Sequence, residues 1–379
     1  MKKATVSSLV FCLGISTVFA GQSLAVGETP LPLYEQARQL VEDNYFEVPS
    51  LPKCQSSACT DPAQAVQAVE NLLASLNNPL NKYLSQPDYQ SAVDMQKLKV
   101  YGIGINLKRD PDGRLLIRRV LEGSPAAMAG LEVGDEIIAV DGKPVLGLSE
   151  TSVAKLIRGP EGSSFKLKFK RENIEHIREV ARIAIVAANL QCRRLPGNVA
   201  LIKLYRFGLL AFPEFAGALK SLSEPGAIVL DLRDSPGGMI DCWLNIFNSL
   251  ADTDSKFLSI YMRGQVSARV TAGIPEDWRY TEKPLVVLIN KGTAAEAEAL
   301  AYSLQKSGRA KVVGTHSAGQ WYHTELFGLP ADAGLQLVTA RYINVDGQNL
   351  PASGVQPDLV VEDEGKQEAA ALSLLSGSK

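Results

Sequence analysis

The stretch PLVVLINKGTAAEAEALAYSLQKSGRAKVVG (284–314) decides the fold of this chain. Residues 285–289 are a continuous apolar run of strand length, which is typical of a strand buried on both faces. Residues 290–292 predict a turn, and we expect a helix to open at Thr293. Its apolar residues at helical spacing are Ala297, Leu300, Ala301 and Leu304. Residues 311–314 begin a second strand, so the stretch indicates strand, turn, helix and strand.

The junction between this strand and this helix is a place where chemistry can be done. A strand that turns sharply into a helix presents the first amides of the helix, with their partial positive charge, to a developing oxyanion at the carboxyl edge of a sheet. The side chain at such a turn is in the position of a nucleophile. Here that position holds Ala295, which has no oxygen.

Four separated motifs, behind a PDZ-like segment, resemble the carboxyl-terminal processing (tail-specific) serine protease family. They are AIVLDLRDSPGG (227–238), PLVVLINKGTAAEAEALA (284–301), GRAKVVGTHSAGQ (308–320) and LVTARYINVDGQNLPASGVQPDLVVE (337–362). The resemblance covers roughly residues 30 to 364. It implies a layered α/β core of the crotonase-like, ClpP type, together with a PDZ domain and an N-terminal helical segment. No cofactor and no metal is indicated by the sequence.

The chain departs from this family at the chemical positions. The family has Gly-Ser-Ala-Ser-Ala-Ser-Glu with the middle serine as nucleophile, whereas residues 292–298 read Gly-Thr-Ala-Ala-Glu-Ala-Glu, which places Ala295 at the nucleophile. The general-base lysine of the family falls on Gln320, and the glutamine that orients it falls on Thr324. The glycines that lend an amide to the oxyanion hole remain, as Gly237 and Gly238.

A related branch, the tricorn-like proteases, takes its base from a histidine ahead of the PDZ segment. The histidines of this chain are His176, His316 and His323, and none precedes residue 100. That branch therefore supplies no base here.

Relocated catalytic groups are a further alternative. Thr293 lies two positions from Ala295, and we expect its hydroxyl to cap the helix. His316 and Ser317 are adjacent, so in a strand they would face opposite sides. His323 shares a strand face with Glu325, but no nucleophile is evident near them.

Residues 98–172 predict the PDZ-like domain. Its carboxylate-binding loop is expected at Tyr101, Gly102, Ile103, Gly104 and Ile105, where glycines allow unusual dihedrals and a close ligand approach. Residues 115–120 and 136–140 predict strands, joined by Gly-Ser-Pro-Ala-Ala-Met-Ala-Gly-Leu (123–131), which is very like a PDZ motif.

A helix over residues 149–157 completes the expected peptide groove. Its apolar face consists of Val153, Leu156 and Ile157. We expect an extended peptide to add as a strand beside residues 103–107, with an apolar pocket accepting its last side chain. A groove filled from within, which serves only as a lid, is the alternative.

The first twenty residues have the pattern of a secretory signal peptide. Two lysines precede an apolar run over residues 9–19, and Ala20 is a small residue before the expected cut. An uncleaved membrane anchor is the alternative, although the run is short for spanning a bilayer. Cys12 lacks the small residue that lipoprotein processing needs before it. We therefore expect an exported protein of the periplasm, with no membrane span after cleavage; a lumen or the outside of the cell is the alternative compartment.

Four cysteines remain in the mature chain. They are Cys54, Cys59, Cys192 and Cys242. An exported protein with four thiols could hold two disulfides, and Cys54 with Cys59 is the favoured pair because their loop is short. Free buried thiols are the alternative for the other two. Spaced cysteines without nearby histidine argue against a zinc site.

Length and charge exclude several classes of function. The 379 residues are more than one domain needs. Without the two leader lysines, 37 basic residues face 41 acidic ones, a net charge near −4, so the chain has no basic footprint for nucleic acid.

Residues 31–97 predict helices, among them one capped by Asp61 with Val66, Val69, Leu73 and Leu76 on its apolar face. In the family this segment often mediates homo-oligomer contacts.

The expected domain order is a signal peptide (1–20), a helical segment (31–97), the PDZ domain (98–172), the protease-like core (173–364) and a C-terminal tail (365–379). Three functions fit it. The first is a catalytically silent homologue that binds apolar C-terminal tails and regulates or recruits a true protease. The second is an active serine-type endopeptidase with a displaced nucleophile. The third is a structural or scaffolding partner whose groove no longer binds.

Overall fold

The computed structural model describes residues 32–51, 61–96, 99–110, 112–121, 123–186, 188–251, 257–267 and 274–377. The expected signal peptide and the Cys54–Cys59 pair lie outside these residues. The chain divides into two compact units. Unit 1 consists of Met1–Gln90, Met262–Gln265 and Thr324–Ala340, and unit 2 consists of Ser91–Tyr261, Val266–His323 and Arg341–Lys379. Each unit is described by itself.

The core of unit 2 is a six-stranded sheet that is parallel except at one edge. In spatial order its strands are β10 (Leu190–Leu195), β11 (Val199–Leu204), β12 (Ala227–Asp231), β15 (Leu285–Ile289), β16 (Lys311–Gly314) and β19 (Leu359–Val360). Only β10 runs antiparallel to its neighbour. Every residue of β12 and β15 is buried, which is why their sequences are continuous apolar runs rather than alternating ones.

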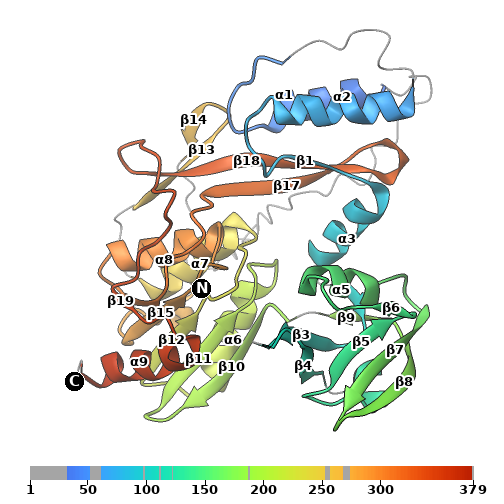
Figure 1. Cartoon of the computed structure of the whole chain (residues 1–379). Coiled ribbons are helices and arrows are strands. Elements are labelled where there is room, and N and C mark those ends of the chain that lie inside the picture. The colour runs from blue at the N-terminus through green and yellow to red at the C-terminus, as the bar shows by residue number, and fades with distance from the viewer. Residues whose placement is uncertain are drawn as a thin grey trace, which may run out of the picture. The chain divides into compact units, whose positions relative to one another are not determined.

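Helices cover both faces of this sheet, which makes the core a layered α/β structure (Figure 1). The helices that pack around the β10 to β16 strands on one side are α6 (Ala211–Ser221), α7 (Ile240–Leu250) and α8 (Glu296–Lys306). Helix α9 (Glu364–Gly377) packs on β15 and β16 through Ala371 and Leu375, which join a buried cluster with Val286, Leu288 and Val313. The residues expected to form a tail are thus mostly a helix.

The PDZ-like segment is a separate small sheet with two helices. Its strands are β3 (Ile105–Arg109), β4 (Leu115–Val120), β5 (Glu136–Val140), β6 (Lys143–Pro144), β7 (Ser164–Arg171) and β8 (Ile174–Ala181). Its helices are α4 (Pro125–Met128) and α5 (Glu150–Ile157), each with a serine as N-cap. The strand order is β3-β4-β5-β7-β8, so β3 stands at an edge, beside α5.

A short two-stranded ladder brings the ends of the PDZ-like segment together. Strand β2 (Lys99–Gly102) pairs antiparallel with β9 (Ile183–Val186). Lys99 is opposite Val186, and Gly102 is opposite Ile183. The whole segment is therefore an insertion whose entry and exit lie next to each other.

Unit 1 contains the N-terminal helices and a strand. Helices α1 (Leu33–Asn44) and α2 (Pro62–Ala74) pack together, and α2 contacts β1 (Lys82–Leu84), which pairs antiparallel with Gly334–Gln336. Asp61 caps α2 by accepting the amides of Ala63 and Gln64, as expected. The buried face of α2 is Ala65, Val69, Leu72 and Leu73. Val66 and Leu76 were expected on this face, which was wrong. Leu76 lies beyond the end of the helix at Ala74, and Ala65 rather than Val66 is buried.

The remaining elements complete the chain. They are α3 (Gln86–Gln96), β13 (Leu258–Met262), β14 (Gln265–Ser267), β17 (Tyr322–Gly328), β18 (Gly334–Asn344) and two 3₁₀ turns at Glu276–Trp278 and Pro330–Asp332. No helix in the described ranges is long and apolar enough to cross a membrane.

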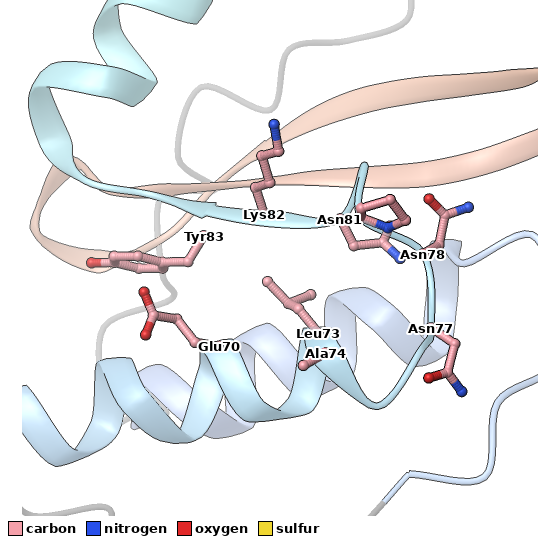
Figure 2. A pocket seen from close by; sticks show the side chains of 9 residues that line it. Glu70, Leu73, Ala74, Asn77, Asn78, Asn81, Lys82 and Tyr83 are labelled. Atoms are coloured by element: carbon pink, nitrogen blue, oxygen red, sulfur yellow. The ribbon is translucent and has the colours of Figure 1, made fainter. Parts of the chain in front are cut away.

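Unit 1 also contains an open pocket of about 540 Å³ between the end of α2 and β1 (Figure 2). Leu73 and Ala74 form its apolar floor, and Glu70 and Tyr83 stand at one end. Only residues 70 to 83 line it. Asn81 also lines the pocket, but its side-chain nitrogen is buried from solvent, so it offers no donor to a ligand.

Candidate active site

The strand-to-helix turn after β15 has a strained backbone at Ala295. This residue has a φ of +50° and a ψ of −116°, a conformation that residues with a Cβ rarely adopt. It is the N-cap of α8, which begins at Glu296. The turn lies where β12 and β15 end, and because these strands are parallel, their following loops meet at one edge of the sheet.

Thr293 fixes the turn but does not cap the helix, so both its expected role and the expected helix start are wrong. Its hydroxyl accepts a hydrogen bond from the amide of Asn290 at 3.0 Å and donates one to the carbonyl of Leu232 at 2.9 Å. Thr293 therefore ties β15 to the loop after β12, and two further residues pass before α8 begins.

A second tie comes from Glu298, a fully buried carboxylate in the first turn of α8. It accepts the amides of Gly319 (2.6 Å), Gln320 (2.7 Å) and Ala295 (3.2 Å). It also accepts the hydroxyl of Ser317 at 2.5 Å. Burial raises the pKa of Glu298, against the lowering effect of these four hydrogen bonds. One carboxylate thus holds the loop of Gln320 against the turn of Ala295.

The structure brings Ala295 and Gln320 together through their backbones. The amide of Ala295 also donates to the carbonyl of Gln320 at 3.1 Å, so two positions far apart in sequence are neighbours. Gln320 is exposed. Thr324 lies in β17 within unit 1, where it is half-buried.

Gly237 lies directly against the turn, and the amide of the next residue, Gly238, donates to the side chain of Glu296. A Cβ added to Gly237 would stand 3.1 Å from the Cβ of Ala295, and one added to Gly238 would stand 2.5 Å from the carbonyl oxygen of Phe207. Their φ angles are +93° and +152°. Both positions therefore need glycine, for space and for conformation.

The hydroxyl groups that the structure brings to this site are buried. Thr293 and Ser235 are 0% exposed and Ser317 is 1% exposed. The hydroxyls of Thr293 and Ser317 each donate one hydrogen bond and accept another. Ser235 has a hydroxyl without a protein partner, but it is closed off from solvent. None of these oxygens is placed to attack a peptide that arrives from solvent.

Sequence reasoning missed one group at this site. Glu296, the residue after Ala295, is buried, and it contacts Gly238, His323 and Tyr342. The only signal in the sequence was its charge at a position where the family motif has alanine. His323 was paired with Glu325 by strand alternation, whereas Glu325 accepts the hydroxyl of Thr339.

The expected peptide groove divides into buried and accessible residues. Ile103, Val153 and Ile157 are buried in the core of the PDZ-like sheet. Ile105 and Leu156 are half-buried and pack against that core from outside. Gly104 has a φ of +82°, and a Cβ there would meet Ser124 at 2.3 Å, so the loop before β3 needs glycine.

Neither cysteine that the structure describes is in a disulfide. Cys192 and Cys242 are both free, and burial raises the pKa of the Cys242 thiol, which keeps it protonated and unreactive. Among the described residues, no group of three or more His, Cys, Asp or Glu side chains is placed to hold a metal ion.

A layered α/β core with a strained strand-to-helix turn, together with an inserted PDZ-like sheet, is the architecture of a peptidase-type protein with a PDZ module. The model of peptidase family S41 matches residues 198–361, and that of the PDZ domain matches residues 116–171. The carboxyl-terminal-processing protease of Synechocystis sp. strain PCC 6803 is 31% identical over 330 residues, which are 82% of this chain and 76% of that protein. The chain therefore belongs to the S41 family of carboxyl-terminal-processing proteases with a PDZ domain.

Other relatives agree with this assignment. The carboxy-terminal processing protease CtpA of Bacillus subtilis strain 168 is 26% identical over 93% of this chain and 73% of its own length. Two solved structures share the fold. A putative S41 protease from Bacteroides fragilis has a TM-score of 0.61 at 18% identity, covering 93% of this chain and 98% of that one. A photosystem II D1 C-terminal processing protease has a TM-score of 0.56 at 23% identity, covering 88% and 93%.

Proposed function

We propose that this protein is a catalytically silent member of the tail-processing family, which binds apolar protein C-termini through its PDZ groove and thereby recruits or regulates an active protease. The observation that carries the silence is the side chain at the strained turn, which is a methyl group. Losing the nucleophile alone costs a serine protease roughly a millionfold in turnover. Gln320, an uncharged side chain that cannot act as a base, stands at the base position as well.

The burial of the neighbouring hydroxyls supports the same conclusion. A displaced serine or threonine nucleophile needs an accessible oxygen with a base within hydrogen-bond reach. The hydroxyls of Thr293 and Ser317 instead donate hydrogen bonds within the protein, to the carbonyl of Leu232 and the carboxylate of Glu298. An active endopeptidase with a relocated nucleophile is therefore the weaker alternative.

The binding half of the proposal rests on the edge strand β3. Within the described residues, its strand partner is β4 alone, which leaves its other edge beside α5 for an added strand. Ile105 and Leu156 supply apolar surface there. A peptide that extends this sheet would gain backbone hydrogen bonds, and its last side chain would contact Leu156.

One digestion experiment tests the silence. The purified mature chain is incubated with a folded carrier protein that ends in an apolar tail, and the carrier's C-terminus is followed by mass spectrometry. We expect an intact tail, as in a mock purification. Tail cleavage that exceeds the mock and is lost in Ser317→Ala or Thr293→Ala would overturn the proposal in favour of a displaced nucleophile.

Fluorescence anisotropy tests the binding. A labelled peptide with a free apolar C-terminus should bind, and the same peptide with a C-terminal carboxamide should bind at least about tenfold more weakly, because the loop before β3 loses its anion. Equal failure of both peptides would leave only a scaffolding role.

We also propose that the chain is exported to the periplasm and forms homo-oligomers through its N-terminal helices. The lysine-led apolar start of the sequence supports export, and the exposed residues of α1 and α2 offer surface for contacts. N-terminal sequencing of protein from the cell envelope should begin at Gly21. Sedimentation of the mature chain should show a species larger than the monomer, and a monomer would contradict the oligomer.

A further inference from the structure

Glu296 is a buried carboxylate that meets donors from three segments of unit 2. Its Oε2 accepts the amide of Gly238 at 2.7 Å. Its Oε1 accepts the hydroxyl of Tyr342 at 2.9 Å and lies 2.7 Å from Nδ1 of His323. The side chain is 2% exposed. A carboxylate buried this deeply is stable only because these donors replace its water.

The Gly238 end of this network lies beside the strained turn. Gly237 stands between the two, since a Cβ on it would meet Oε2 of Glu296 at 2.3 Å and the Cβ of Ala295 at 3.1 Å. Gly238 itself is exposed, yet its amide points at Glu296. Oε2 of Glu296 thus accepts the hydrogen bond that the Gly238 amide could otherwise donate to a substrate carbonyl oxygen near residue 295.

We propose that Gly238, His323 and Tyr342 form a carboxylate-binding site that the chain fills with its own Glu296. This internal anion keeps the Gly238 amide from any substrate carbonyl. The blocking role rests on the proposed silence of the site, whereas the carboxylate site itself does not. Restoring Ala295→Ser and Gln320→Lys alone would therefore leave the oxyanion position filled.

Chemical rescue tests the carboxylate site without any reference to activity. Glu296→Ala removes Cγ and the carboxylate, which together have the size of an acetate ion. We expect this variant to melt on the order of 10 °C below wild type, because three donors lose the buried acceptor that they share. Sodium acetate should recover part of that loss and saturate with concentration, relative to sodium chloride of equal ionic strength.

Two controls make the rescue specific. Leu300→Ala creates an apolar cavity in the same helix, and acetate should not rescue it beyond sodium chloride. Glu296→Gln keeps the volume filled, so acetate has no space to enter. If Glu296→Ala does not fold during expression, its refolding yield in acetate and in chloride is the measurement. Equal melting or equal yield in the two salts overturns the carboxylate site, and so does equal rescue of Leu300→Ala.

A serine-directed fluorophosphonate probe tests the blocking role. Ala295→Ser/Glu296→Ala/Gln320→Lys should label at least about tenfold faster than Ala295→Ser/Gln320→Lys, each checked for folding by circular dichroism. A triple variant no more reactive than the double variant overturns the blocking role. Labelling of the wild-type chain would overturn the proposed silence instead, and the acetate rescue would stand or fall independently.

Discussion

Ala295 holds a backbone conformation that alanine itself does not favour. Residues with a Cβ pay about 1 to 3 kcal/mol for such dihedrals, and they keep them only when the surroundings impose them. Here the surroundings are the Glu298 carboxylate, the Gln320 carbonyl and the Ser235 carbonyl, which bind the amides of residues 294 and 295. The neighbouring groups therefore impose this strained conformation on a residue that is an alanine.

The first prediction follows from this strain. Ala295→Gly should raise the free energy of unfolding by about 1 kcal/mol, because glycine adopts a positive φ without a steric penalty. The matched control is Ala297→Gly, two residues later in the helix, which should lower it by about 1 kcal/mol. Urea unfolding measures both. Destabilisation by the same amount in both variants would show that the turn is not strained.

The second prediction concerns the buried Glu298. Its folded pKa is raised above the ordinary 4.5 by burial, so the stability that it contributes is complete below pH 4.5 and is lost as pH rises through the folded pKa. Glu298→Gln has no such titration. We expect the wild type to exceed this variant in stability, by a margin that narrows as pH rises from about 4.5. Urea unfolding at several pH values measures the margin, and a margin that widens would contradict the raised pKa.

At this scale the sequence predicts positions better than contacts. The apolar run at 285–289 indicated the turn before Ala295, and the family resemblance implied that Gly237 and Gly238 belong to the same site. The sequence could not show what Glu296 does, because the partners of a buried carboxylate come from distant segments. The prediction for Thr293 was also wrong. A threonine hydroxyl can bond the amides of a helix start or the backbone of a neighbouring loop, and here the tertiary hydrogen bond to Leu232 determines its orientation.

At the scale of elements, we expect the surface between strand β3 and helix α5 to determine which peptides the PDZ domain binds. Three of the expected groove residues, Ile103, Val153 and Ile157, belong to the core, so changing them would unfold the domain. Leu156 is half-buried on α5 and can be changed without creating a cavity in that core. It is therefore the residue with which to separate binding from folding.

The third prediction uses this separation. Leu156→Glu should weaken the binding of an apolar tail peptide about tenfold, because a charge replaces the apolar contact of the last side chain. The control is Leu146→Glu, at an exposed loop position of the same domain, which should bind as wild type does. Anisotropy titrations with melting curves measure the effect, and unchanged affinity in Leu156→Glu would mean that the peptide does not contact α5.

The fourth prediction concerns α9, which covers one face of the central sheet. Ala371 is fully buried against that sheet, whereas Ala369, half a turn away, is exposed. Ala371→Asp should lower the free energy of unfolding by more than about 3 kcal/mol, since it buries an unpaired charge. Ala369→Asp should change it by less than about 0.5 kcal/mol. Equal stability of the two variants in urea would show that α9 does not pack as described.

The strands of the core were predictable because parallel strands buried on both faces read as apolar runs. The sequence runs at 285–289 and 311–314 coincide with β15 and β16. The edge strand β10 and the helix α9 were not expected. β10 alternates polar and apolar residues weakly, and the alanines and leucines of α9 are not confined to one face of the helix, so neither segment gives a strong periodic signal.

At the scale of the whole molecule, the PDZ domain is an insertion held by the β2–β9 ladder. Because Gly102 and Ile183 are paired, the chain between them can be replaced by a two-residue turn. The fifth prediction is that replacing residues 103–182 by Asn-Gly leaves a chain that melts cooperatively and no longer binds tail peptides. Calorimetry and anisotropy measure this, with residues 99–186 expressed alone as the binding control. An aggregated product would mean that the remaining chain depends on the PDZ domain.

The same ladder has a consequence for engineering. Paired residues on neighbouring strands lie about 5 Å apart, so any foreign domain whose two termini are that close could be spliced between Gly102 and Ile183. Under the proposed catalytic silence, the core would not cleave the spliced domain. The protein could then carry interchangeable sensor domains for the protein tails that they detect.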